Sequence, residues 1–461
     1  MSTNTDNNQA GASPAPRAAG LPPLGESVLS DASRIMTEAL KSHAAWERVA
    51  VWTDTFGPRL SGSEALERAI DWALAEMERD GLANVHGEPV MVPHWVRGEE
   101  SCQLIEPRPM SLSMIGLGGS IGTGPDGVTA EVMAVESFAE LNERAAEVRG
   151  KIVLFDVPYV SYGETVAYRA RGAMEAGRHG AVAALVRSIA SGWMNNPHTG
   201  GMRYAEGVEP IPTAALSVEH AMLLHRMVAR GAQVVVRLTM GAHQLPDAPS
   251  RNIVGEIVGS ERPEEVVVLG GHIDSWDIGQ GAMDDAGGFV ASWEALNVIR
   301  RLGLTPRRTI RVVGWTNEEN GLRGGTGYRD AHRDDVPRHV MAMESDAAFF
   351  RPTHFNFHGE PEGLSILEAI AKVVEPHGPF SVGAGGPGAD ISPLATEGVP
   401  TLSLGSDSNQ YFRYHHSAAD TPEKLDPDEV AHGVGVLGVY AYVLAQWPGR
   451  LTGRPFTRRL R

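Results

Sequence analysis

The sequence has only one cysteine, Cys102, among its 461 residues. A single thiol excludes an intramolecular disulfide and a zinc site built from thiolates. Any metal ion bound by this chain must therefore take its ligands from histidine and carboxylate side chains, which are borderline to hard ligands. We expect Cys102 itself to be buried and to have no part in catalysis.

Long apolar runs and an excess of positive charge are also missing. No stretch of roughly 18 apolar residues occurs, so we expect no membrane span. Lys and Arg number 40 against 57 Asp and Glu, and this balance argues against a nucleic-acid partner, which needs a basic face. Residues 1–25 are polar and lack a basic start before an apolar core, so we predict a disordered segment and a cytoplasmic protein.

Strand and helix patterns divide the chain into two kinds of region. Ser63–Met77 has apolar residues at helical spacing, and Val85–Val96 has the pattern of an edge or irregular strand interrupted by prolines. Between residues 110 and 245 the sequence pattern changes, and few clusters of acidic residues and histidines occur. We interpret 110–245 as an inserted domain, with 26–109 and 246–461 forming the main domain.

From Asn252 onward, strands and helices alternate, which favours an α/β fold with a central, largely parallel sheet flanked by helices. Ligands of such sheets bind outside the carboxyl ends of the strands. The expected strands include Val266–Leu269, Thr309–Trp315 and Val340–Met343. A histidine or carboxylate follows each of them: His272, Glu318, Glu319 and Asp346.

These residues are of the types that a pair of divalent ions requires. Two ions about 3.5–4 Å apart need a bridging carboxylate and terminal nitrogen or oxygen ligands on each ion. The chain offers His272, Asp284, Glu319, Asp346 and His416. Asp274, two residues after His272, can fix the tautomer of that imidazole. Glu318 lies next to a candidate ligand and is the natural general base for an attacking water. The pattern predicts a two-metal hydrolase.

The same residues resemble the M28 zinc peptidases, in particular their carboxypeptidase Q (plasma glutamate carboxypeptidase) branch. The resemblance rests on the segments GGHIDSWDIGQGAMDD, NEEN, MESDAAFF and HHSAADT, and extends from about Ser27 to Pro448. It implies a zinc-peptidase-like mixed, largely parallel sheet with a protease-associated domain inserted at about 110–245. It also implies two Zn²⁺ per chain and short peptide substrates, especially dipeptides with free termini.

The resemblance assigns a role to each candidate residue. His272 and Asp346 would bind one zinc, Glu319 and His416 would bind the other, and Asp284 would bridge them. Glu318 would be the base, and Asp274 the support of His272. The family often has a cis peptide after the bridging aspartate, here Asp284–Asp285.

One position departs from several relatives, which have a tyrosine before the last ligand. Here it is His415, and we hypothesise that His415 donates a hydrogen bond to the oxyanion. The resemblance also implies a homodimer and, in contrast to the N-terminal pattern, a secreted protein.

Four other functions remain open at this stage. An M20-type peptidase uses a similar order of ligands, but the spacing from Glu319 to His416 leaves little room for its dimerisation insert. An M28-fold aminopeptidase of broader specificity or a glutaminyl-cyclase-like acyltransferase would share the fold, the latter with one metal ion. A non-catalytic, receptor-like relative would have lost a ligand or the base, and neither is missing here.

Overall fold

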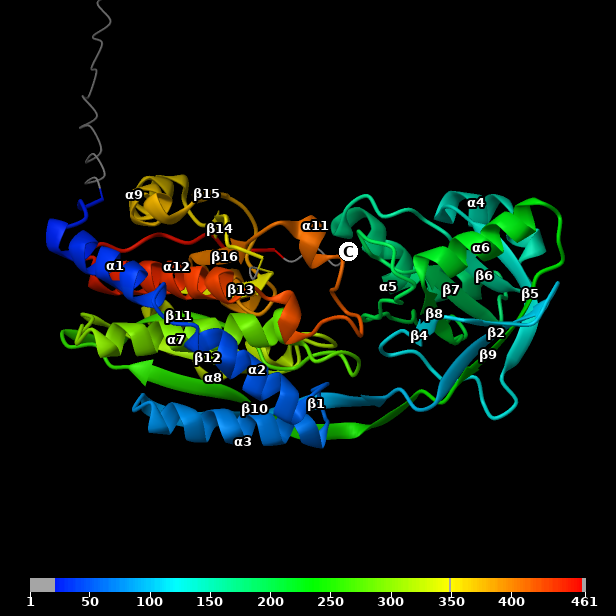
Figure 1. Ribbon diagram of the computed structural model, residues 1–461, viewed down its shortest axis with the longest axis horizontal. Helices are drawn as coiled ribbons and strands as arrows, with labels where there is room; N and C mark the ends of the chain where they lie inside the picture. The colour runs from blue at the N-terminus through cyan, green and yellow to red at the C-terminus, as the bar shows by residue number, and fades with distance from the viewer. Residues whose placement is uncertain (1–20, 348–349, 458–461) are drawn as a thin grey trace, which may run out of the picture.

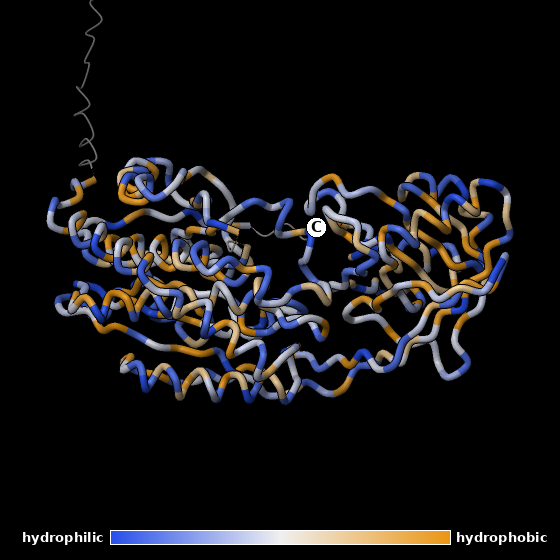
Figure 2. The backbone as a smooth tube through the Cα atoms, viewed as in Figure 1, coloured by the Kyte–Doolittle hydropathy of each residue, from blue (hydrophilic) through white to orange (hydrophobic). Residues whose placement is uncertain are grey.

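The protein has two lobes, each built around one eight-stranded sheet (Figure 1). The computed structural model describes residues 21–347 and 350–457. The segment predicted to be disordered therefore lies largely outside the described residues, and the first helix begins at Glu26. Apolar stretches gather in the interior of both lobes (Figure 2), where separate clusters of buried side chains form the cores.

The first lobe contains the sheet that the sequence predicted. Its strand order is β1–β10–β12–β11–β13–β16–β14–β15, and β12, β11, β13 and β16 are parallel to one another. Its strands are β1 Ala83–Val96, β10 His243–Ile257, β11 Arg262–His272, β12 Arg308–Trp315, β13 His339–Ala347, β14 His354–His358, β15 Ser381–Ala384 and β16 Thr401–Gly405.

Helices cover both faces of this sheet because successive residues of each central strand point to opposite sides. Val267 and Leu269 of β11 pack in the large cluster with α7 and α12, whereas Val266 and Val268 pack with α8 and α10. The helices are α1 Glu26–Ala39, α2 Ala44–Phe56, α3 Glu64–Arg79, α7 Gly287–Arg301, α8 Arg323–Ala331, α9 Leu364–Val374, α10 Ser392–Thr396, α11 Ser408–Tyr411 and α12 Pro427–Gln446.

The second lobe contains the other sheet, of order β3–β2–β9–β5–β6–β7–β8–β4, in which β5 to β8 run parallel. Its strands are β2 Glu100–Glu106, β3 Met110–Leu112, β4 Met114–Gly116, β5 Val128–Val135, β6 Ile152–Phe155, β7 Ala183–Arg187, β8 Thr213–Leu216 and β9 Val235–Met240. Its helices are α4 Phe138–Glu143, α5 Tyr162–Arg178 and α6 Val218–Ala229.

The chain enters and leaves the second lobe at one point. Val96, at the end of β1, pairs with His243, at the start of β10. The expected boundary at residue 110 falls too late, since it separates β2 from its partner β3, and the second sheet begins near Glu100. The short β2 alternates exposed and buried residues, so it lacks the apolar run that marks a strand most clearly.

The α/β fold with a mixed, largely parallel sheet is confirmed. The prediction of β1 as an edge strand is correct as well, because it pairs only with β10. β10 begins at His243, well before its buried apolar residues Ile253 and Val254. Residues 243–247 of that strand are exposed, so no apolar pattern indicates them, and their pairing with β1 alone makes them a strand.

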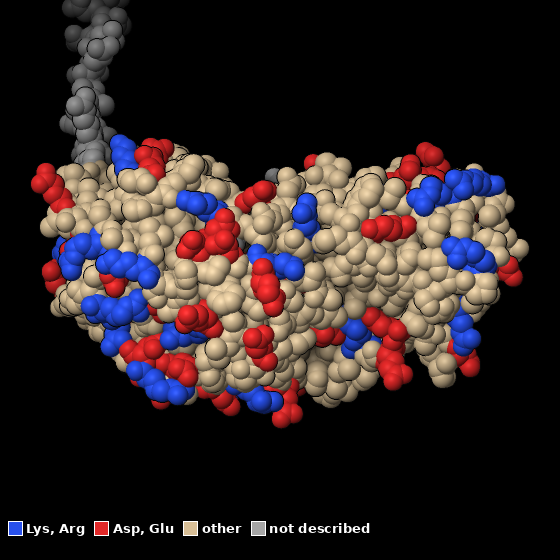
Figure 3. Space-filling view, in the orientation of Figure 1, with Lys and Arg blue, Asp and Glu red and all other residues tan. Residues whose placement is uncertain are grey.

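The surface contains both signs of charge. Basic and acidic side chains alternate over the face shown in Figure 3 without a large region of one sign. In the part of the chain that the structure describes, no helix is long and apolar enough to cross a membrane.

Trp276, in the loop after β11, joins the two lobes. Its side chain is 2 % exposed and belongs to the core cluster of the second lobe, together with Trp95 and Leu238. The ring lies against Gly118, where an added Cβ would come within 1.9 Å of it. The loop that follows His272 is therefore anchored in the neighbouring lobe.

We expect Trp276→Ala to lower the free energy of unfolding by about 3–5 kcal/mol, the usual cost of emptying a buried tryptophan site. Trp193→Ala is the matched control, because Trp193 is 60 % exposed and its loss should change stability by less than about 0.5 kcal/mol. Chemical denaturation followed by circular dichroism measures both. Equal stability of the two variants would contradict the anchoring role.

Candidate metal centre

The parallel strands of the first sheet deliver most of the candidate residues to one edge. His272 is the last residue of β11, Asp346 lies near the end of β13, and Glu318 and Glu319 follow β12 directly. Since β11 pairs with both β12 and β13 in parallel, the carboxyl ends of the three strands meet. The structure thus brings together the residues that the sequence predicted to share a sheet edge.

Asp284 reaches the same edge from the turn that precedes α7. Asp420 holds this turn, because its carboxylate accepts hydrogen bonds from the backbone N–H groups of Ala282, Met283 and Asp284 at 2.9–3.3 Å. The neighbouring Asp285 accepts from the N–H groups of His272 and Gly288, both at 3.0 Å. The Asp284–Asp285 peptide bond is cis, as the resemblance implied.

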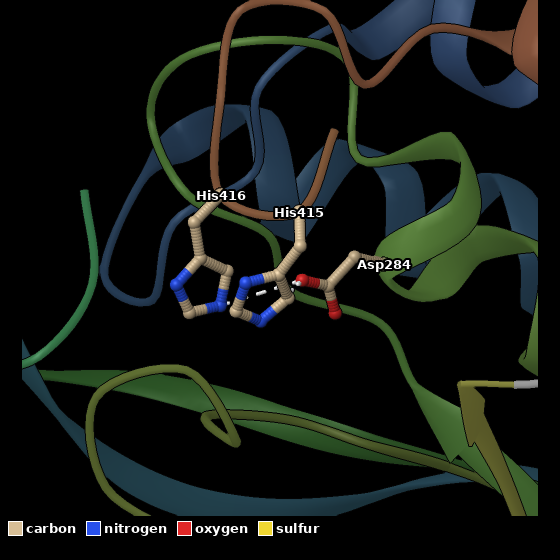
Figure 4. Close-up of side chains that lie close together, drawn as sticks. All are labelled: Asp284, His415 and His416. Atoms are coloured by element: carbon tan, nitrogen blue, oxygen red, sulfur yellow. Dashed lines mark ion pairs between the residues drawn. The ribbon is translucent and has the colours of Figure 1, made fainter. Parts of the chain in front are cut away.

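The carboxylate of Asp284 faces several histidines, of which Figure 4 shows His415 and His416. Its Oδ1 lies 3.1 Å from Nε2 of His272, and its Oδ2 lies 3.3 Å from Nε2 of His416. Nε2 of His272 is also 3.6 Å from Asp346, and Nε2 of His416 is 2.9 Å from Glu319. All five candidate ligands converge, in two groups that have only Asp284 in common.

The structure refines the role expected for Asp274. Nδ1 of His272 lies 2.9 Å from the backbone carbonyl of Asp274 and 3.7 Å from its carboxylate. The carbonyl therefore fixes the tautomer in which Nε2 is free to bind a metal ion. The carboxylate of Asp274 instead accepts from the backbone N–H groups of Glu318 and Glu319, at 3.0 and 3.3 Å, so it positions the expected base and ligand.

His415 is buried beside the proposed ligands. Its ring stacks on His416 with the centroids 3.5 Å apart, and its Nε2 lies 3.6 Å from Oδ2 of Asp284. Nδ1 of His415 is buried without a hydrogen-bond partner. Asp284, His415 and His416 also satisfy the geometry of a three-ligand group, so the arrangement admits His415 as a ligand as well as a hydrogen-bond donor.

The electrostatics of the site suit bound cations. Burial raises the pKa of Glu318 to about 8, and burial together with the nearby Asp284 holds the pKa of Glu319 well above its usual range. Burial, with His415 and Arg169 nearby, keeps the pKa of His416 well below its usual range, so its imidazole is neutral. Oδ2 of Asp284 is buried without a hydrogen bond. The neutral imidazole of His416 and the crowded carboxylates are donors of the kind that a divalent ion binds.

A cavity of about 480 Å³ opens onto these residues, and the second lobe forms part of its wall. Tyr162 and Arg169 of α5 line the cavity, together with Tyr411 from α11. These three residues belong to no motif, so no sequence pattern predicted them. Asp277 anchors the loop after β11, because it accepts from Nε of Arg97 at 2.8 Å.

The loop that contains His416 rests on the second lobe. The backbone N–H of Thr199 donates to the carbonyl of His416 at 2.9 Å, and His198 forms an isolated bridge with Ser417. Tyr162 stacks on Phe412, with the ring centroids 4.7 Å apart. His198 and Thr199 therefore support the loop that contains His416.

Comparison with known proteins gives this site a family. Residues 252–438 match peptidase family M28. The chain is 47 % identical to human carboxypeptidase Q over 401 residues, which is 87 % of this chain and 85 % of the human protein. The chain belongs to peptidase family M28. This M28 protein is therefore a peptidase, and the resemblance found in the sequence is confirmed.

Solved structures of relatives agree with this assignment. An M28 peptidase precursor from Shewanella amazonensis is 35 % identical and superposes with a TM-score of 0.90, covering 94 % of this chain and 100 % of its own. A zinc aminopeptidase from Bacillus subtilis, 18 % identical, shares the fold of this M28 peptidase with a TM-score of 0.64 over 86 % of this chain and 94 % of its own.

We expect Asp274→Asn to weaken zinc binding by roughly 10- to 100-fold, the usual effect of losing a residue that orients a ligand. The single oxygen of the new amide can accept from only one of two backbone N–H groups, those of Glu318 and Glu319. Competition with a chromophoric chelator measures the affinity. Asp277→Asn is the control in the same loop, and an equal loss in both variants would contradict the positioning role of Asp274.

Proposed function

We propose that this protein is a two-zinc exopeptidase that hydrolyses short peptides, most of all dipeptides with free termini. The observation that carries the proposal is the sharing of Asp284, each of whose oxygens faces a different imidazole. His272 and Asp346 would hold one zinc ion, and Glu319 and His416 the other, with Asp284 between them. The family and the zinc aminopeptidase from Bacillus subtilis support the choice of metal.

Glu318 is proposed as the general base. Asp274 fixes its backbone, and its side chain lines the cavity without being needed as a ligand. It would take a proton from the attacking water and pass it to the leaving amine. Zinc, when bound, supplies the Lewis acid that polarises the scissile carbonyl and makes the water more acidic.

His415 is proposed to stabilise the oxyanion that develops on the scissile carbonyl. Burial and the nearby Arg169 keep the pKa of His415 well below its usual range, and a neutral imidazole still has one N–H to donate. A hydrogen-bond donor that is already in position in a site with little water stabilises an oxyanion more than a donor in bulk water does.

The homodimer implied by the resemblance also remains part of this proposal, and light scattering tests it.

Replacement of the base gives the decisive test. We expect Glu318→Gln to lower kcat for dipeptides by about 10²- to 10⁴-fold, since the amide cannot accept the proton. Zinc content, measured by elemental analysis, should stay that of the wild type. Glu261→Gln is the control, because that carboxylate is 57 % exposed and pairs with Arg307. Full dipeptide hydrolysis by a Glu318→Gln protein that still contains two zinc ions would refute the mechanism.

Metal stoichiometry separates the roles of the other residues. We expect Asp284→Ala to lose both zinc ions, Asp346→Ala to lose one, and His415→Ala to keep both while kcat falls by about 10²-fold or more. Elemental analysis after dialysis counts the ions. Loss of zinc from His415→Ala would make His415 a ligand, and unchanged activity in that variant would remove its role as oxyanion donor.

A further inference from the structure

The second lobe places one buried cation in the wall of the catalytic cavity. Arg169 lies on α5, is 7 % exposed, and lines the cavity beside Glu318 and His416. Its guanidinium also lies near the ring of Tyr162, with Cζ 5.4 Å from the ring centroid. No other described arginine or lysine lines this cavity, so Arg169 is its only fixed positive charge apart from any metal ion.

Most N–H donors of Arg169 lack a short hydrogen bond. Nη2 donates to the hydroxyl of Tyr162 at 2.7 Å, but Nη1 is 3.4 Å from both the carbonyl of Thr199 and Nδ1 of His416. Nε is buried and has no hydrogen-bond partner. If Nε2 of His416 binds a metal ion, its Nδ1 keeps its hydrogen and cannot accept from Arg169. One N–H of Nη1 and one of Nη2 are then available to an acceptor.

Arg169 also lacks an anionic partner. Among the described residues, every carboxylate lies more than 4.0 Å from its guanidinium, whereas the buried Arg97 pairs with Asp277 and the buried Arg187 with Asp156. A buried charge is costly unless an opposite charge compensates it. In the proposed two-zinc state, Glu319, Asp284 and Asp346 would bind the metal ions, so none of these carboxylates would pair with Arg169.

We propose that Arg169 binds the free C-terminal carboxylate of the peptide substrate. The inference rests on the proposed peptidase function and deepens it by assigning the group that selects the free carboxyl end. A guanidinium presents two parallel N–H groups that match the two oxygens of a carboxylate. The anion that Arg169 lacks in the protein is then supplied by the substrate.

The position of Arg169 fits a cleavage site close to the chain end. Its Nη1 lies 3.4 Å from His416, a proposed ligand, and successive Cα atoms of a peptide are 3.8 Å apart. A carboxylate one residue beyond the scissile bond therefore falls within reach of Arg169. A longer chain would place a neutral peptide group against this cation. The arrangement favours removal of a single C-terminal residue or hydrolysis of a dipeptide.

Paired substrates test this assignment. Zinc-loaded wild-type protein should hydrolyse leucylalanine with a kcat/KM about 30- to 1,000-fold above that for its C-terminal amide, the range expected for a buried charged pair. Arg169→Gln should lower the value for the free acid to near that of the amide, with a much smaller effect on the amide itself. Arg169→Lys keeps the charge but lacks the two parallel N–H groups, so its kcat/KM for the free acid should lie between those of the wild type and Arg169→Gln. Arg171→Gln is the control on the same helix, because Arg171 faces Phe138.

A binding measurement gives a readout that does not need turnover. In the Glu318→Gln background, calorimetry should find that the acid binds more tightly than the amide, and that Arg169→Gln removes this difference. Zinc content and thermal unfolding show that each variant is folded and loaded. Arg169→Lys serves the same comparison if Arg169→Gln does not fold.

Three results would overturn the inference. Wild-type protein could treat acid and amide alike, Arg169→Gln could retain the preference for the acid, or Arg169→Gln could lower both activities equally. The last result would make Arg169 a positioning residue for His416. If wild-type protein with two zinc ions hydrolyses no peptide of any kind, the proposed function itself fails, and this outcome differs from the other three.

Discussion

The concentration of carboxylates at one buried edge is the constraint on which the structure depends. Asp274, Asp284, Asp285 and Asp420 are each at most 4 % exposed, and burial so close together raises the free energy of their charged forms. Backbone N–H groups compensate three of them: Asp274, Asp285 and Asp420 each accept two or three such bonds. Asp284 is the exception, since imidazoles rather than N–H groups face its oxygens, and this difference supports the proposal that it bridges two metal ions.

The tight packing around Asp285 explains why the loop from Gly270 to Gly288 is rich in glycine. Gly271 and Gly288 lie so close to Asp285 that an added Cβ would come within 2.1–2.3 Å of its carboxylate, and Gly288 would also meet the carbonyl of Ser345. Side chains at these positions would displace Asp285 and, through its hydrogen bond to His272, the strand end itself. The glycines therefore allow two peptide segments and one carboxylate to pack at a distance that no other residue permits.

Much of this site could be predicted because parallel strands place their carboxyl ends at one edge. His272, Glu318, Glu319 and Asp346 each follow an apolar strand, and this local pattern indicates a common location. The contact of His272 with the carbonyl of Asp274 instead of its carboxylate depends on the backbone path of three residues, which no side-chain pattern reveals. Tyr162, Arg169 and Tyr411 belong to no motif, and the first two reach the cavity from helix α5 of the second lobe, so their approach depends on how the lobes pack.

The pairing of Val96 with His243 has a consequence for the order in which activity can arise. The second lobe begins and ends at adjacent rungs of one antiparallel ladder, so the flanking strands can align only when the intervening polypeptide has brought its own ends together. His416 and Trp276 are then held by contacts with that lobe. The sheet edge alone does not make the complete cleft, so peptidase activity depends on the native packing of both halves of the polypeptide.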